Sequence, residues 1–169
     1  MGAKDNKSWI GYGVKYGGIL IVPGIETTEG IIYNVQSFSW KEKFTLTSVR
    51  IGLGLGGGIS AVAVCAFNCA SLGQLDGLEI KDWGVNIALA GADVSPMFET
   101  LAKIGANLDK LTPAQIEKIR NGMHYLYNAY DIASMDSAPK VVAFDLGGIG
   151  AEISVNYVFG NLEINWGTV

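Results

Sequence analysis

The feature of this sequence that most constrains its fold is a stretch of 25 residues without a charged side chain, between Arg50 and Asp76. A transmembrane helix needs about 20 apolar residues, so the length alone would allow one. The first part of the stretch, IGLGLGGG, alternates glycine with leucine or isoleucine. This alternation has the period of two of a β-strand, whereas a helix requires a period near 3.6. We therefore predict strands that change direction at residues 56–58, with a membrane-inserting hairpin as a variant.

The combination of strand, glycine cluster and strand occurs three times along the chain. Besides IGLGLGGGISAVAV, it is found in GVKYGGILIV near the N-terminus and in FDLGGIGAEISV near the C-terminus. Glycine has no Cβ, so it lets a strand bend and lets neighbouring strands approach, as closed or strongly curved sheets require. The three glycine clusters therefore predict a strongly curved or barrel-like sheet.

The middle of the chain has helical signals instead. Thr112 and Gln115 have the spacing of a capping box, with proline at the first helical position between them. Ser95-Pro96 begins a shorter predicted helix that ends at Gly105. Together they predict a helical hairpin from about residue 95 to residue 133. The apolar residues that we expect to face inward are Met97, Leu101 and Ile104 on the first helix, and Ile116, Ile119, Met123, Leu126, Tyr127 and Tyr130 on the second.

The remaining segments are interpreted from turn signals and alternation. Residues 23–30 (PGIETTEG) are predicted to form a turn. The next segment, residues 31–49, is predicted to form one or two half-exposed strands. Residues 84–91 and 161–169 are predicted strands, the latter following a turn at Gly160-Asn161. The large residues that we expect in one phase of the second segment are Phe38, Trp40, Phe44 and Leu46.

Strands followed by two helices and then by strands indicate the α+β class, because regular alternation of the two is absent. We predict one domain over residues 1–169 with a flexible N-terminus at residues 1–8, and a mostly antiparallel sheet covered by the helical hairpin. The composition fits a domain with little polar surface: 17% of residues are charged, 49% are hydrophobic, and 23 are glycine.

Charge and cysteine content exclude several classes of function. The net charge of −4 and the pI near 4.9 disfavour binding to a phosphate backbone, so we expect no nucleic-acid partner. The two cysteines, Cys65 and Cys69, are expected to be buried free thiols in a reducing compartment. No apolar signal-type segment follows the first charged residues, so we expect a cytoplasmic protein.

No residue pattern identifies a reaction. His124 is the single histidine, which leaves no multi-histidine metal site and no catalytic triad unless His124 itself serves. The carboxylates are scattered along the chain, and neither cysteine has a basic neighbour in sequence that would activate it. We therefore assign no catalytic residue, no metal site and no cofactor, and expect a protein that is not an enzyme.

One short motif supports an alternative. Gly52, Gly54 and Gly57 satisfy the pattern G-x-G-x-x-G, and IGLGLGGG resembles the first turn of the dinucleotide-binding dehydrogenases. The resemblance covers only these eight residues. It implies an NAD(P)-dependent oxidoreductase, with a helix after the glycines and an acidic residue about 20 residues further on. Asp76 and Glu79 lie near that distance but neither clearly ends a strand.

The aromatic residues suggest a different use of the sheet. Tryptophan and tyrosine rings often line the mouth of a barrel that holds an apolar ligand, although packing in the core and between strands explains them too. We predict a non-enzymatic binding module for a hydrophobic small molecule, a lipid or a membrane surface. A protein that interacts or forms a homo-oligomer through apolar strands is the alternative. The candidate ligand-binding residues are Trp9, Tyr12, Tyr16, Trp40, Trp83 and Trp166.

Overall fold

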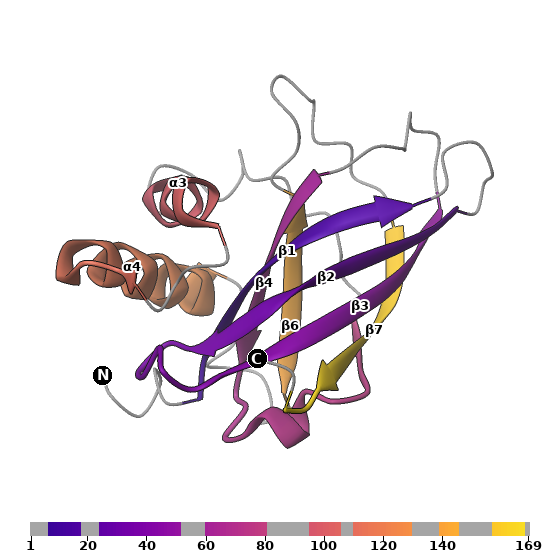
Figure 1. Ribbon diagram of the computed structural model, residues 1–169, viewed down its shortest axis with the longest axis horizontal. Coiled ribbons are helices and arrows are strands. Elements are labelled where there is room, and N and C mark those ends of the chain that lie inside the picture. The colour runs from indigo at the N-terminus through magenta and orange to yellow at the C-terminus, as the bar shows by residue number, and fades with distance from the viewer. Residues whose placement is uncertain are drawn as a thin grey trace.

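A computed structural model describes residues 7–17, 24–51, 60–80, 95–105, 110–129, 139–145 and 157–167. The strands and helices follow one another in the order strands, two helices, strands (Figure 1). The elements are β1 (Trp9–Gly17), β2 (Gly24–Asn34), β3 (Lys41–Ile51), β4 (Ser60–Phe67), the 3-10 helix η1 (Leu72–Gln74), β5 (Leu78–Ile80), α3 (Ser95–Ile104), α4 (Pro113–Ala129), β6 (Lys140–Asp145) and β7 (Tyr157–Asn165).

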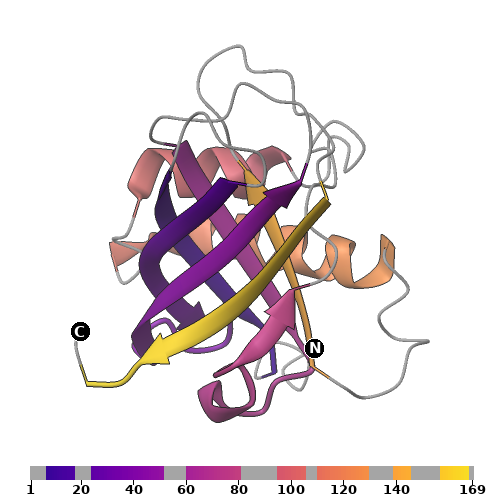
Figure 2. The same cartoon turned by 90° about the vertical axis from the view of Figure 1, so that its right-hand side faces the viewer.

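Within the described residues, seven strands form one antiparallel sheet in the order β5-β7-β3-β2-β1-β4-β6. The sheet curls, so that β3 and β7 lie on one side of its inner cluster of side chains and β4 and β6 on the other (Figure 2). The two strands at the ends of this order, β5 and β6, thereby come close to each other. The predicted α+β fold with a strongly curved antiparallel sheet and a helical hairpin is confirmed.

β1 and β2 approach each other closely at one pair of glycines. Gly13 and Gly30 are cross-strand partners, so neither strand has a side chain at this point. A Cβ atom on Gly30 would collide with the backbone oxygen of Tyr12. The position therefore requires glycine because the two backbones are too close for any side chain. This pair is not one of the three clusters singled out above, and the bending of strands at those clusters stays a prediction.

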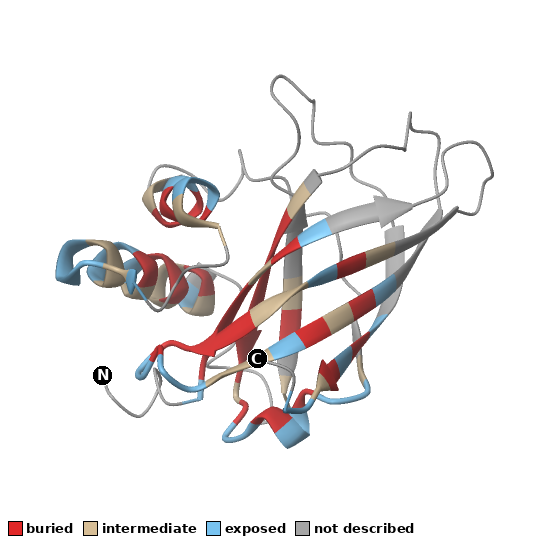
Figure 3. Ribbon diagram, viewed as in Figure 1, coloured by how far each residue is buried: buried red, intermediate tan, exposed pale blue. Residues whose placement is uncertain are grey.

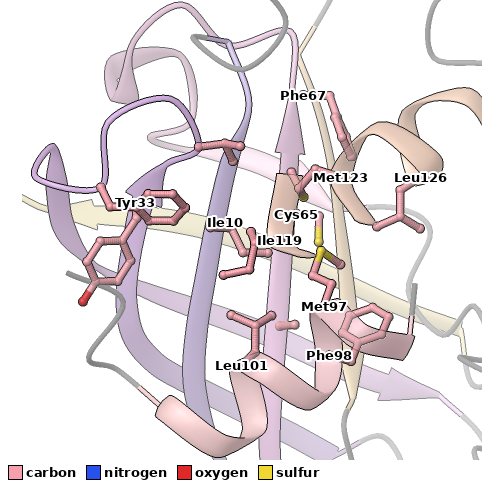
Figure 4. Close-up of a cluster of buried hydrophobic side chains, with 13 residues drawn as sticks. Ile10, Tyr33, Cys65, Phe67, Met97, Phe98, Leu101, Ile119, Met123 and Leu126 are labelled. Atoms are coloured by element: carbon pink, nitrogen blue, oxygen red, sulfur yellow. The ribbon is translucent and has the colours of Figure 1, made fainter. Parts of the chain in front are cut away.

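The curled sheet has a buried layer on each of its faces. On the outer face, α3 and α4 cover β1, β2 and β4, and Figure 4 shows side chains from the helices and these strands in one cluster. On the inner face, side chains from β1, β2, β3, β4, β6 and β7 meet in a second cluster. Figure 3 shows the resulting burial along the strands and the exposed positions on the two helices. Strands buried on both faces explain why so few residues are charged.

The helices match their sequence signals. Thr112 and Gln115 form the predicted capping box: the Thr112 N–H donates to Gln115 Oε1 at 2.9 Å, and the Gln115 N–H donates to Thr112 Oγ1 at 3.3 Å. The inward apolar residues are confirmed except Tyr130, which lies outside the described residues. A Cβ atom on Gly122 would lie 2.6 Å from Met97 Cβ, so glycine allows the two helices to pack closely.

The predicted turn at residues 23–30 is wrong for residues 24–30. These residues are the first part of β2, where Gly24–Gly30 pairs with β3 and Glu26–Gly30 also pairs with β1. A strand between two neighbours has all its backbone groups satisfied, and this outweighs the turn preference of PGIETTEG. The predicted turn at Gly160-Asn161 is wrong for the same reason. Both residues lie inside β7, paired with β3 on one side and β5 on the other.

The predicted phase of the aromatic residues after β2 is also wrong. Asn34 ends β2, and its Oδ1 accepts hydrogen bonds from the backbone N–H groups of Gln36 and Ser37. The resulting turn breaks the alternation before β3 begins. Phe38 consequently packs in the helix-covered outer cluster, whereas Phe44 packs in the inner cluster.

Residues 60–67 form strand β4 and not a helix. No helix among the described residues is long and apolar enough to cross a membrane. The glycine clusters at 56–58 and 147–148, and the predicted strand at residues 84–91, lie outside the described residues, whereas Gly17 is the last residue of β1. Lys7 and Ser8, which we expected in a flexible N-terminus, accept backbone hydrogen bonds from Cys69 and Val35.

Candidate functional site

The inner face of the sheet is the candidate site, since side chains from six of the seven described strands gather there in one buried apolar cluster. Alternate residues of each strand point to it, as the period of two requires. Trp9 is the first residue of β1 whose side chain faces inward, and Ile32 faces inward from β2. The other buried apolar residues of this face are Phe44, Leu46, Val62, Val64, Ala66, Val141, Leu162 and Ile164.

Residues 68–77, which we call the floor, close one end of the inner face. Leu72 and Leu75 are buried in the inner cluster, at the end of the sheet where β4 finishes and β5 begins. Four hydrogen bonds hold the floor in place. The indole Nε1 of Trp9 donates to the Cys69 carbonyl at 2.8 Å, Cys69 N to Lys7 O at 2.9 Å, Gly77 N to Leu162 O at 2.7 Å, and Ile164 N to Asp76 Oδ1 at 3.0 Å.

The inner face around the Gly13–Gly30 pair is filled by side chains. A Cβ atom on Gly11 would lie 3.0 Å from the ring of Phe44, which shows that the ring packs over this glycine. Leu46 and Leu162, the next inner residues along β3 and β7, are fully buried and pair with each other. The floor end is thus an apolar core.

A buried hydroxyl lies on the inner face in the row next to the Gly13–Gly30 pair. Thr28 is the next inner residue of β2 and is fully buried. Its Oγ1 has no hydrogen-bond partner among the described residues. In the register of the sheet, Thr28 pairs with Lys15 of β1 and with Leu46 of β3.

Neither cysteine is suited to nucleophilic chemistry. Both are free and buried, Cys65 under the helices and Cys69 in the floor. Burial raises the pKa of the Cys65 thiol far above its ordinary value and raises the pKa of Cys69 to about 12. The Cys69 Sγ also donates to the Phe67 carbonyl at 3.3 Å. Both therefore remain neutral thiols at physiological pH and act as small core residues. This agrees with the expectation of buried free thiols.

The structure places the predicted ligand-binding aromatics at different sites. Trp9 is buried at the floor end, and its ring makes an edge-to-face contact with Trp40, the centroids being 4.7 Å apart. Tyr12 lies on the opposite face of β1, against the outer cluster. Trp40 is 43% exposed just before β3, and Trp166 is 54% exposed just after β7. Among the predicted residues whose side chains the structure describes, Trp9 and Trp40 are the two that it brings together.

The remaining predicted site residues are Tyr16, Trp83 and the three glycines. Tyr16 lies in β1 and pairs with Thr27. Trp83 and the glycines 52, 54 and 57 lie outside the described residues. The dinucleotide-binding interpretation needs a helix after these glycines, and its N-terminus would hold the pyrophosphate. The next described residues form strand β4 instead, so this interpretation has no support from the described part of the chain.

No group of three or more His, Cys, Asp or Glu side chains suited to a metal ion occurs in the part of the chain that the structure describes. His124 is half-buried on α4. Comparison of the chain with protein-family models, with curated proteins and with solved structures finds no match. The site therefore has to be interpreted from its own chemistry.

Sequence reasoning missed Thr28 and the floor. Thr28 lies within the segment that was predicted to be a turn, and a turn residue has no reason to be buried. The β-branched residues Thr27, Thr28, Ile31 and Ile32 were the signal available for a strand. The floor had none, because SLGQLDG is typical of an exposed turn until Leu72 and Leu75 are seen to point into the inner cluster.

Proposed function

We propose that this protein is a non-enzymatic binding module that holds a hydrophobic small molecule or a single lipid chain at the inner face of its curled sheet. The observation that carries the proposal is that the floor closes one end of this apolar face. The floor seals it at one end with Leu72 and Leu75, and the strands surround it with apolar side chains. Small-molecule sites are typically concave and apolar, with a few polar groups that orient the ligand.

Two further observations support a binding role over an enzymatic one. The cysteines are protonated core residues, and the pKa of each thiol is raised by burial alone. One buried polar group on the inner face, the Thr28 hydroxyl, has no hydrogen-bond partner among the described residues, so no general base of the described chain activates it as a nucleophile. The free buried thiols also suit a reducing compartment, and we place the protein in the cytoplasm as part of this proposal.

Binding of an amphiphile with a twelve-carbon chain tests the proposal. Native mass spectrometry and calorimetry with dodecanoic acid and 1-dodecanol should show saturable binding of one molecule per chain. Because a ligand at 100 times its Kd stabilises the folded state by about 2.7 kcal/mol, the midpoint of thermal unfolding should rise by about 5–10 °C. The same titration on protein unfolded in urea is the control for non-specific association. If neither molecule binds and phosphatidylcholine vesicles retain no protein, the proposal is wrong.

A second candidate function is association with another protein or with a second copy of the chain. The floor end carries two exposed indoles, Trp40 and Trp166. The turn that contains Trp166 is held to the start of β3 by a hydrogen bond from Gly167 N to Glu42 Oε2 at 3.1 Å, two residues from Trp40. Tryptophan is enriched in protein interfaces. Light scattering should then show a dimer or larger species that Trp40→Ser and Trp166→Ser together convert to a monomer. A monomer at high concentration would count against this candidate.

A further inference from the structure

The central segment of the floor, residues 70–75, makes only local hydrogen bonds within the part of the chain that the structure describes. The Ala70 N–H donates to Gln74 Oε1 at 2.6 Å, and the Leu75 N–H donates to the Leu72 carbonyl at 3.0 Å. The other hydrogen bonds of the segment join it to itself or to the three residues that follow it. Packing, and not hydrogen bonding, therefore holds the central segment against the strands of the inner face.

Both ends of the central segment are fixed. On one side, the Cys69 carbonyl accepts the hydrogen bond of the Trp9 indole, and on the other, Asp76 and Gly77 are bonded to β7. Asn68 and Gly77 have positive φ angles of 61° and 80°, so the chain turns sharply where it enters and leaves the floor. The central segment is therefore a short loop that is fastened at its two ends.

Two leucines connect the central segment to the inner cluster. Leu72 is 1% exposed and Leu75 is 0% exposed, whereas the other residues of the segment are exposed. Apolar packing is not directional, so another apolar group of suitable volume can replace a leucine side chain. An alkyl chain consists of the same CH₂ and CH₃ groups and can fill the same volume.

We propose that the central segment is a lid: Leu72 and Leu75 leave the inner cluster, and the apolar chain of a ligand takes their place among the side chains of the sheet. The inference rests on the proposed function, since it assigns the place where the ligand enters. It needs no empty cavity in the closed protein, because the two leucines vacate the volume that the ligand fills. The hydrogen bonds at Cys69, Asp76 and Gly77 stay intact, so the lid opens without unfolding of the sheet.

Labelling of an introduced thiol tests the opening of the lid. In the full chain with Leu75→Cys, iodoacetamide reacts with the introduced thiol when the segment leaves the cluster, and tandem mass spectrometry compares it with Cys65 and Cys69 of the same molecule. The introduced thiol should be labelled at least about tenfold faster than both, because local opening requires less free energy than global unfolding. Leu162→Cys is the matched control. It makes the same change in the same cluster on β7, and its thiol should be labelled about as slowly as Cys65.

Labelling in the presence of dodecanoate tests whether the ligand replaces the leucines. Saturating dodecanoate should raise the labelling rate of the thiol in Leu75→Cys by about threefold or more, because the bound chain keeps the segment away from the cluster. It should slow the labelling of Cys65, because ligand binding stabilises the folded protein. Leu72→Cys should show the same pattern and serves if Leu75→Cys does not fold, which far-UV circular dichroism shows.

The outcomes are distinguishable. If the wild type binds neither dodecanoate nor 1-dodecanol, the proposed function fails. If it binds dodecanoate and the thiol in Leu75→Cys is labelled no faster than Cys65, the segment does not open by itself and the lid is wrong while the proposed function stands. The same holds if dodecanoate slows every thiol equally, because the ligand then leaves the leucines in place. Fast labelling of Leu162→Cys would mean that the whole inner cluster opens, which also overturns the lid.

Discussion

The indole Nε1 of Trp9 donates a hydrogen bond of 2.8 Å to the backbone carbonyl of Cys69, 60 residues further along the chain. Both residues are fully buried, so the bond ties the first residue of β1 to the floor inside the apolar core. An unpaired carbonyl at this depth would have no access to water. The bond is therefore one of the contacts that determine where the floor lies against the curled sheet.

Trp9→Phe should destabilise the fold by about 2–3 kcal/mol, because it removes the donor, leaves the Cys69 carbonyl without this bond and leaves space in the core. The free energy of unfolding in urea measures the effect. Trp40→Phe is the matched control: Trp40 is 43% exposed and keeps an aromatic contact with Trp9 after the change, so its cost should stay below about 1 kcal/mol. Equal effects in the two variants would contradict the role of the buried bond.

Gly30→Ala should destabilise the protein by about 3 kcal/mol or more, because the added Cβ collides with the Tyr12 backbone oxygen and forces β1 and β2 apart. The loss should be visible as reduced yield of folded protein and a lower midpoint in urea. Gly73→Ala is the control, since the nearest atom to its Cβ is Ser71 Oγ at 3.6 Å. A Gly30→Ala variant as stable as the wild type would show that the strands do not approach as closely as described.

Arg120 links α4 to the turn between β2 and β3. Its Nε donates to the Val35 carbonyl at 3.0 Å and its Nη2 to the Gln36 carbonyl at 2.8 Å. Arg120→Ala should cost about 1–3 kcal/mol, and Arg120→Lys should recover only part of this, since an ammonium group cannot reproduce the planar pair of donors. Hydrogen exchange of α4 amides should accelerate in both variants. Lys118→Ala, an exposed change on the same helix, should stay within about 0.5 kcal/mol of the wild type.

The buried thiols should make stability fall at alkaline pH. The pKa of Cys69 is raised from 9.0 to about 12 in the folded protein, and the pKa of Cys65 is raised too. Below pH 9 both states keep the thiol proton and the stability is unaffected. Between pH 9 and pH 12 the unfolded chain releases protons that the folded chain keeps, so the free energy of unfolding decreases as pH rises, by up to about 1 kcal/mol per pH unit for each thiol.

Urea unfolding at pH 8, 9, 10 and 11 measures this slope. The double variant Cys65→Ala, Cys69→Ala should have a shallower slope above pH 9, although its stability at pH 8 should be lower because of the lost packing. The comparison of slopes isolates the contribution of the two thiols, because the two proteins are otherwise identical. Identical slopes would mean that the thiols titrate normally in the folded state.

The local signals in the sequence determined much of the architecture. The capping box at Thr112 and Gln115 and the spacing of Ile119, Met123 and Leu126 depend on contacts within one helix turn or one helix face, so a sequence window contains them. The period of two in β1 likewise depends only on backbone geometry. From these signals the α+β class, the curved antiparallel sheet and the helical hairpin could all be predicted.

The tertiary structure determined what packs against each face of the strands. On β1, the large residues Ile10 and Tyr12 lie under the helices, and the alternating glycines face the inner cluster, where the Phe44 ring fills the space over Gly11. Residues 24–30 and Gly160-Asn161 lie in strands and not in turns, because adjacent strands pair with their backbone groups. The burial of Thr28 and of the floor also depends on residues far away in sequence. A sequence pattern can show that side chains alternate between the two faces of a strand. The folded chain determines whether each face is exposed to solvent, covered by a helix or buried in the inner cluster.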